Sequence, residues 1–287
     1  MKVVNFSLEN GNRYYGKIDG ERFFIGQRVP YQGLKGLMNV AGSPAQKYDR
    51  AQYRAIHGFW ADFMHPTAMA EGALFHTLNT YDRALFTFSF LQYAAHVPNG
   101  DFVVYLRSLL ALSQARDYFP DLTLQNGRIC RVTDTGVRPL ESDDSTTGLQ
   151  DYLNPTSQEV EDTEIVQAAK FIHWVQRDPE HRHVQVAVGV AHFKEKMKRY
   201  AVQYHLDGAD DITCLLVADI RHQGRAKGPV IAAALASSNP QAALLKIGET
   251  SYPERVATLK REIKALTADG TFGRRRYHLD SGEFALN

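Results

Sequence analysis

The sequence is poor in cysteine and has no long apolar run. Its 287 residues include two cysteines, Cys130 and Cys214, which are too few for a disulfide framework or a cysteine-built zinc site. We therefore expect two buried free thiols, with a single disulfide between them as the alternative. No apolar stretch approaches the ~20 residues that span a bilayer, and the first ten residues contain no apolar signal-peptide core. These absences predict a protein made in the cytoplasm without a signal peptide and without membrane insertion.

The sequence also has no large excess of positive or negative charge. Thirty-three basic residues against thirty-two acidic ones leave a net charge of +1, which provides no long-range field for a polyanion, so we expect no nucleic-acid partner. The sequence has no GxSxG, Walker A or Rossmann glycine pattern. His181 and His183 have no carboxylate at a metal-ligand spacing. We therefore expect neither a metal nor an organic cofactor.

Alternating apolar and polar residues at the start of the chain indicate strands. Val3–Leu8, Arg13–Ile18 and Arg22–Val29 are separated by Asn-, Asp- and Gly-containing turns, which favour hairpins because these residues tolerate positive φ. The pattern predicts a small antiparallel meander. With the loop that follows, we expect it to form a separate N-terminal element over residues 1–45.

Helical periodicity dominates the rest of the chain. In the first half we expect helices over Gln46–Met64, from Pro66 to about Phe75 and over Asp101–Arg116, short strands within Leu122–Leu140, and a mobile loop over Glu141–Gly148. Beyond Thr156 we expect helices alone, over Gln158–Gln176, His183–Tyr204, Asp211–Gln223, Pro229–Ser237, Gln241–Ile247 and Pro253–Ala268. The predicted fold class is α+β and predominantly α-helical. Residues 46–287 form one expected catalytic region, divided into lobes 46–140 and 141–287.

Two carboxylic residues in the segment 71–89 are candidates for catalysis. Glu71 closes a short helix in an apolar neighbourhood, where desolvation raises the pKa of a carboxyl group. Asp82 lies in a polar turn, a setting that keeps a carboxylate ionised. Glycosidic bond cleavage needs such a pair, one as acid and the other as base or charge stabiliser. The alternative is a solvated helix glutamate and a turn-forming aspartate.

The order Glu71-Gly72, Tyr81-Asp82 and Thr87 resembles the active-site segment of phage-type lysozymes. The resemblance covers residues 71–89 and implies a lysozyme-like helix–β-hairpin–helix layout. It assigns general acid catalysis to Glu71 and places Asp82 and Thr87 around an attacking water. Ser89 stands where that family usually has glycine. Lytic transglycosylases and chitosanases share the layout, and the stretch up to Gln92 is similar to the glutamine-containing stretch of the transglycosylases.

Further residues are candidates for binding a glycan. Tyr81 and Gln92 flank the predicted hairpin, and Gln223 and Arg225 lie in a turn that follows a predicted helix. For that turn, the alternative is a solvated connection whose cations favour the helix dipole. Trp60 and Trp174 are large enough to stack on sugar rings, although aromatic residues at helical spacing more often belong to a core.

These features predict a muramidase-like glycoside hydrolase that degrades peptidoglycan at β-1,4 bonds. The expected partners are peptidoglycan or a related β-1,4 amino-sugar polymer and an immunity or inhibitor protein that covers the Glu71 cleft. The site of action is the cell wall or periplasm, reached by phage lysis or by a secretion machine as an antibacterial effector. The alternatives are a chitosanase, a lytic transglycosylase that needs only the glutamate, or a non-catalytic polysaccharide- or protein-binding module such as a phage structural component.

Overall fold

The computed structural model describes residues 1–286 and divides the chain into two compact units. Unit 1 consists of residues 1–47 and 72–188, and unit 2 of residues 48–71 and those from 189 on. Helix accounts for 45% of the structure and strand for 21%, and the strand pairings in the described part of the chain are antiparallel. The fold therefore contains both helices and strands, with more residues in helices than in strands. The boundaries between the two units follow residues 47, 71 and 188.

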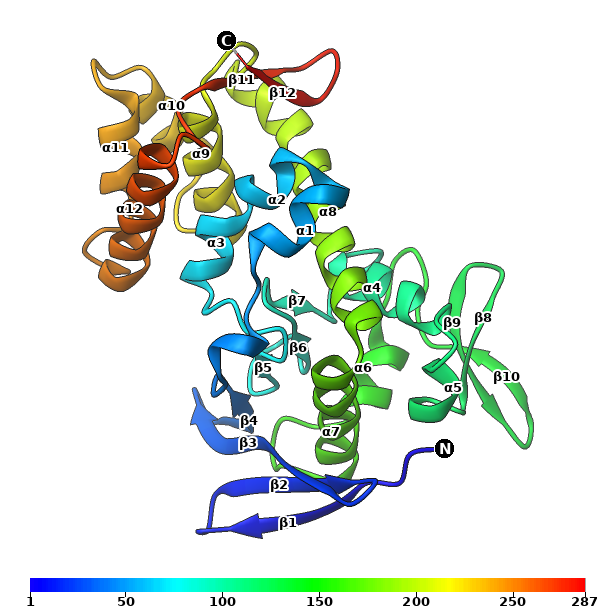
Figure 1. Cartoon of the computed structure of the whole chain (residues 1–287). Helices are drawn as coiled ribbons and strands as arrows, with labels where there is room; N and C mark the ends of the chain where they lie inside the picture. The colour runs from blue at the N-terminus through cyan, green and yellow to red at the C-terminus, as the bar shows by residue number, and fades with distance from the viewer. Residues whose placement is uncertain (287) are drawn as a thin grey trace. The chain divides into compact units, whose positions relative to one another are not determined.

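A seven-stranded antiparallel sheet forms the first part of unit 1 (Figure 1). Its strands, in sequential order, are β1 (Asn5–Glu9), β2 (Arg13–Ile18), β3 (Glu21–Tyr31), β4 (Leu34–Asn39), β5 (Leu78–Asn79), β6 (Thr87–Phe88) and β7 (Tyr93–Ala94). The three predicted meander strands are confirmed, and their turns contain Asn10 and Asp19 at positive φ. The meander is not a separate element, because β4 pairs with β5 through Met38 and Asn79.

Helices and a second sheet complete unit 1. They are a 3₁₀ turn η1 (Pro44–Gln46), α4 (Asp101–Leu110), α5 (Ala115–Tyr118), α6 (Thr147–Leu153), α7 (Asp162–Arg177) and the strands β8 (Leu122–Gln125), β9 (Arg128–Thr133) and β10 (Gly136–Pro139). The predicted mobile loop is tied down where it begins. Glu141 is buried and accepts hydrogen bonds from Arg107, Arg128 and the Ile129 N–H, and α6 begins at Thr147.

The core of unit 1 is built around Phe171 on α7. Its ring centroid lies 5.0–6.1 Å from those of five other aromatic side chains, namely Phe86, Phe88, Phe102, Tyr105 and Phe119. Such tilted ring contacts add stabilisation beyond the burial of apolar area. Helix α7 also packs against β2 and β3, so it joins the first sheet to the aromatic core.

Unit 2 is mostly helical. It contains α1 (Arg50–His57), α2 (Phe59–Phe63), α3 (His65–Ala70), α9 (Asp211–Gln223), α10 (Gly228–Leu235), α11 (Pro240–Lys246), α12 (Pro253–Ala268) and a hairpin of β11 (Arg275–His278) and β12 (Glu283–Leu286). Helices α9 and α12 have the predicted bounds. The predicted helix 46–64 is broken, because Gly58 has φ +58° between α1 and α2. The hairpin was not predicted, since its short, charged strands show no clear alternation.

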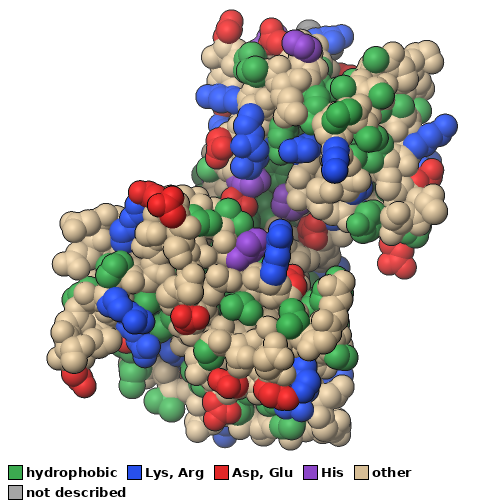
Figure 2. All heavy atoms as spheres, turned by 180° about the vertical axis from the view of Figure 1, so that it is seen from behind, with side chains coloured by type: hydrophobic (Ala, Val, Ile, Leu, Met, Phe, Trp, Pro, Cys, Tyr) green, Lys and Arg blue, Asp and Glu red, His purple; other side chains and the backbone are tan. Residues whose placement is uncertain are grey.

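The long helix α8 (Pro179–Tyr204) contributes residues to both units. Cys130 in unit 1 and Cys214 in unit 2 are buried free thiols, as predicted. Among the helices of residues 1–286, none has both the length and the apolar character that crossing a membrane requires. On the face seen in Figure 2, cationic and anionic side chains are interspersed, in keeping with the balanced composition.

A buried carboxyl group connects α7 to the first sheet. Glu164 is fully buried, and its Oε1 accepts hydrogen bonds from the Leu37 N–H at 3.1 Å and from the Thr80 hydroxyl. Its Oε2 has no hydrogen-bond partner in the described part of the chain. Burial outweighs these hydrogen bonds and raises the pKa of Glu164 to about 7. The folded protein therefore takes up a proton here more readily than the unfolded chain does.

We predict that Glu164 makes the protein less stable as pH rises. Its pKa is 4.5 when unperturbed and about 7 in the fold, so the free energy of unfolding should fall by up to about 3 kcal/mol between pH 4.5 and 7. The variant Glu164→Gln stays uncharged and should lack this component. Urea unfolding of both proteins at pH 4.5, 6 and 8 measures the difference. Parallel pH profiles for the two proteins would contradict the assignment.

Candidate functional site

Glu71 stands at the end of a helix because the backbone that follows cannot continue it. Helix α3 begins at His65 and Pro66, and the Glu71 N–H donates to the carbonyl oxygen of Thr67 at 3.1 Å. Gly72 and Ala73 then adopt φ values of +90° and +62°, which end a right-handed helix. The helix-end position predicted for Glu71 is therefore confirmed, whereas the predicted continuation to residue 75 is wrong.

The Glu71 carboxylate is the first member of a chain of alternating charges in unit 2. Its Oε1 accepts a hydrogen bond from Arg255 Nη1 at 2.5 Å. Arg255 Nη2 donates to Asp219 Oδ1 at 2.7 Å, and Arg225 Nη1 donates to Asp219 Oδ2 at 2.5 Å. Helix α12 supplies Arg255 in its first turn, α9 supplies Asp219, and Arg225 follows the end of α9. We call these four residues the charge network.

Burial increases along the charge network away from Glu71. The side chain of Glu71 is 14% exposed, that of Arg255 8%, that of Asp219 0% and that of Arg225 1%. Taking such charges out of water is expensive unless each one is paired with good geometry. Glu71 is thus the member nearest to solvent, and the other three hold its carboxylate in place.

The pairing keeps the buried members of the network ionised. Burial on its own raises the pKa of the Asp219 carboxyl, but Arg255 and Arg225 outweigh it and lower the pKa below its ordinary value. Burial similarly lowers the pKa of Arg255, while Asp219 and Glu71 raise it further than burial lowers it. Buried, paired charges of this kind occur at functional sites, and structural ion pairs show them too.

A histidine adds an uncharged ring beside Glu71. His222 Nε2 lies 3.8 Å from Glu71 Oε1, and its ring stacks on Phe193 with the centroids 5.8 Å apart. Burial lowers the pKa of His222, so the ring is neutral at pH 7. The apolar neighbourhood predicted for Glu71 is therefore wrong, because a guanidinium faces the carboxylate. Local sequence could not reveal this, since Arg255 is 184 residues further along the chain.

The other two predicted catalytic residues belong to unit 1. Asp82 Oδ1 accepts a hydrogen bond from the Ala84 N–H at 2.8 Å, and Oδ2 accepts one from the Asn79 amide at 3.2 Å, so this carboxylate shapes the turn after β5. Thr87 is buried on β6 and pairs with Asn79 of β5. The structure thus gathers Asp82 and Thr87 around one short hairpin. It assigns Glu71 to unit 2 together with Arg255.

Ser89 adopts a backbone conformation that side chains other than glycine rarely adopt. Its φ is +103°, in the region that favours glycine. The residue is fully buried, and its Oγ accepts a hydrogen bond from the Leu91 N–H at 3.2 Å. Gln92, also at positive φ, donates its N–H to the Ser89 carbonyl oxygen at 3.0 Å. The tight turn before β7 is therefore formed with serine in place of glycine.

The predicted glycan-binding residues divide into accessible and buried ones. Tyr81 is half-buried, with its ring centroid 5.5 Å from that of Tyr31, and Gln223 is half-buried beside Arg225. The side chain of Arg225 is buried, and its donors bind Asp219 and the Ile247 carbonyl oxygen.

Neither tryptophan offers an open ring face for sugar stacking. Trp60 and Trp174 are almost completely buried, and Trp60 Nε1 donates to Glu283 at 2.6 Å. Trp174 stacks on Tyr118 with the ring centroids 4.9 Å apart. Both side chains therefore belong to the cores of their units, which is the alternative that helical spacing favours.

Comparison of the chain with known proteins yields no match. No protein-family model, curated protein or solved structure corresponds to it. Within residues 1–286, no three His, Cys, Asp or Glu side chains gather in a way that could hold a metal ion. We take the charge network, with Glu71 at its outer end, as the candidate site.

We predict that removing the charge of Asp219 destabilises unit 2. In Asp219→Asn, Arg255 and Arg225 stay buried with their shared counter-charge gone. Breaking a buried ion pair in this way costs about 3–5 kcal/mol. Chemical denaturation should show this loss, whereas Asp280→Asn, at an exposed position of the same unit, should change the free energy of unfolding by less than about 0.5 kcal/mol. Equal stability of the two variants would rule out the role given to Asp219.

We predict that two substitutions of Ser89 affect stability to different extents. Ser89→Gly removes the strain of positive φ and loses one hydrogen bond, so the free energy of unfolding should change by less than about 1 kcal/mol. Ser89→Val puts a β-branched residue at a φ that it resists and should cost more than about 2 kcal/mol. Thermal and urea unfolding measure both. A valine variant as stable as the glycine variant would contradict the conformation described here.

Proposed function

We propose that this protein is a lysozyme-like glycoside hydrolase that cleaves β-1,4 bonds of peptidoglycan, with Glu71 as the general acid. The observation that carries the proposal is the position of Glu71 as the solvent-facing end of a buried charge network. A glutamate at a helix end, fixed by a buried arginine and still partly accessible, meets the positional requirement for transferring a proton to a bound substrate.

The charge network can stabilise the negative charge that develops on Glu71 when it gives up its proton. Arg255 contacts Oε1 of Glu71, so a proton on Oε2 leaves that contact in place. As the proton moves to the leaving glycosidic oxygen, a negative charge develops on Glu71 beside the guanidinium, which stabilises it. The network then has no net charge, because two carboxylates balance two arginines. A neutral network does not repel the oxocarbenium-like sugar that forms at this stage.

The second carboxylate of the proposal is Asp82, with Thr87 beside it in the same hairpin. In this scheme Asp82 positions a water molecule or stabilises the developing positive charge on the sugar. Both Asp82 oxygens, however, accept hydrogen bonds within their own turn, which is also what a purely turn-forming aspartate does. This observation favours a second candidate, a lytic transglycosylase that relies on Glu71 alone. A chitosanase would apply the same chemistry to a different β-1,4 amino-sugar polymer.

The proposed substrate places the site of action at the bacterial cell wall or periplasm. Because the polymer lies outside the cytoplasm, the proposal includes delivery by cell lysis or by a secretion machine. A cell that makes the enzyme and has the same wall then needs protection. We propose an immunity or inhibitor protein whose surface covers Glu71.

We predict that Glu71→Gln removes activity while the fold stays intact. The change is nearly isosteric and eliminates the proton donor, so cleavage of purified cell walls should fall at least about 100-fold. Glu249→Gln is the matched control, because Glu249 is exposed and paired only with Lys260 among the described residues. Loss of turbidity of a suspension of purified cell walls measures the rate, and circular dichroism checks the fold. If Glu71→Gln cleaves as fast as the wild type, another active site must exist.

Asp82→Asn separates the two enzymatic candidates. Under assisted hydrolysis it should lose activity to an extent comparable with Glu71→Gln, and mass spectrometry should show products that have gained one water molecule. Under the transglycosylase candidate, activity should remain near normal and the products should lack that water. If the purified wild type cleaves neither peptidoglycan nor chitosan, the enzyme proposal fails and a non-catalytic binding module becomes the better account.

A further inference from the structure

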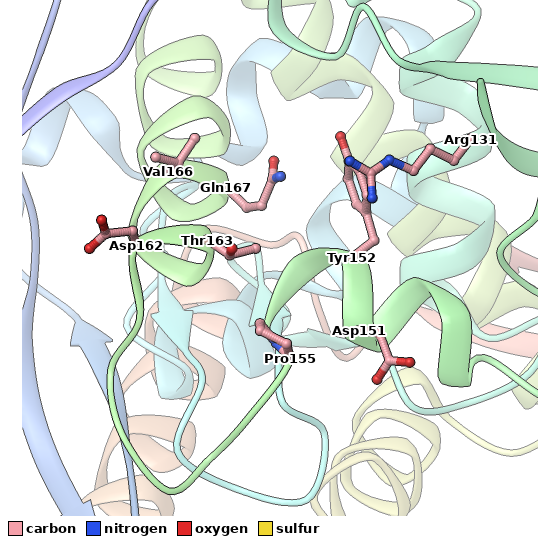
Figure 3. Close-up of a pocket in the computed structure, with 8 residues that line it drawn as sticks. All are labelled: Arg131, Asp151, Tyr152, Pro155, Asp162, Thr163, Val166 and Gln167. Atoms are coloured by element: carbon pink, nitrogen blue, oxygen red, sulfur yellow. The ribbon is translucent and has the colours of Figure 1, made fainter. Parts of the chain in front are cut away.

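Unit 1 contains a cavity that the proposed catalysis does not use. It has a volume of about 420 Å³ and lies where α6 and α7 meet β9 (Figure 3). The size is within the range of pockets that hold small molecules. Figure 3 shows the side chains of Gln167 and Thr163 projecting from α7 toward the Tyr152 ring and the Arg131 guanidinium, with Pro155 below them.

An incompletely bonded amide points into this cavity. Gln167 is 7% exposed, and its Oε1 has no hydrogen-bond partner in residues 1–286. Burying a carbonyl oxygen without a donor is unfavourable by about 1–3 kcal/mol. The terminal amide torsion is soft, so a small rotation presents Oε1 to a donor within the cavity. A ligand that carries an N–H group would satisfy it.

On the opposite wall, the guanidinium of Arg131 is positioned for an anion. Its Nε donates to Asp121 Oδ2 at 3.1 Å, and it lies over the Tyr152 ring, 5.2 Å from the centroid. The Tyr152 hydroxyl donates to Asp121 Oδ1 at 2.9 Å, so one carboxylate orients both side chains. The two terminal nitrogens of Arg131 form no hydrogen bond with the described protein and match the geometry of a carboxylate.

Charge and shape narrow the class of ligand. Asp151 and Asp162 also line the cavity, and Figure 3 shows their carboxylates turned away from Arg131 and Gln167. Their negative charges disfavour a doubly charged anion, while Gln167 favours a ligand with an N–H-bearing nitrogen. Because Arg131 covers the Tyr152 ring, the cavity offers no open aromatic face for a sugar. We propose that this cavity binds an α-amino carboxylate, the group shared by a free amino acid and the C-terminal residue of a short peptide. Arg131 binds the carboxylate, and Gln167 accepts the N–H.

Calorimetric titration of the full chain with alanylalanine, alanine, N-acetylalanine and alaninamide tests this proposal. Alanylalanine or alanine should bind with a Kd of about 1 mM or below. Alaninamide should bind at least about tenfold more weakly, because it offers Arg131 no carboxylate. Tighter binding of alanine identifies a free amino acid as the ligand. Tighter binding of alanylalanine and N-acetylalanine identifies a peptide end.

Variants of the lining residues test whether the probe binds in this cavity, and a control variant and thermal midpoints check the effect of charge and of folding. Arg131→Gln and Gln167→Met should each weaken binding of the preferred probe, the first by at least about tenfold. Arg116→Gln removes the same charge from an exposed position of unit 1 and should leave the Kd unchanged. Thermal midpoints show whether each variant is folded. The proposal is overturned if no amino-carboxylate probe binds, if alaninamide binds equally well, if N-acetylglucosamine binds more tightly, or if folded Arg131→Gln binds like the wild type.

Discussion

The carboxylate of Asp219 is the charge on which unit 2 depends most. It has no exposed surface, and two arginines from different parts of the chain donate to its two oxygens. Each arginine makes a second contact. Arg255 reaches Glu71 at the end of α3, and Arg225 reaches the carbonyl oxygen of Ile247 at the end of α11. One buried negative charge thereby links four helical segments. Its loss would leave two buried cations without their shared partner, which is the expensive case for ion pairs inside proteins.

The same arrangement fixes the position of the Glu71 carboxylate. A glutamate at the end of an ordinary surface helix is mobile and solvated, whereas here a nearly buried guanidinium fixes one carboxylate oxygen. Preorganised charges of this kind are effective because they need not reorient as the reaction proceeds. The cavity beside Arg131 in unit 1 contains a similar but smaller arrangement of charges. There, Asp121 fixes an arginine whose terminal nitrogens remain available to a ligand.

Turns and helix ends that depend on neighbouring residues in the chain could be predicted from the sequence. The turns at Asn10-Gly11 and Asp19-Gly20 have the positive φ values that these residues tolerate, and α9 ends at Gly224 in a left-handed conformation. The helix-end position of Glu71 was also predicted. The charge network was not, because its members lie at positions 71, 219, 225 and 255 and meet only after folding. For the same reason Arg225 resembled a surface cation, and the hairpin near the C-terminus carried no usable pattern.

The central proposal is that Glu71 and Arg255 act together in catalysis, and a double-mutant cycle on cell-wall cleavage tests it most directly. Arg255→Lys retains the charge but loses the geometry of the guanidinium. It should slow the wild-type enzyme by at least about tenfold and should slow Glu71→Gln no further, because residues that act together lose their effects non-additively. Equal fold losses in both backgrounds would show that Arg255 does not act through Glu71, and would contradict the account.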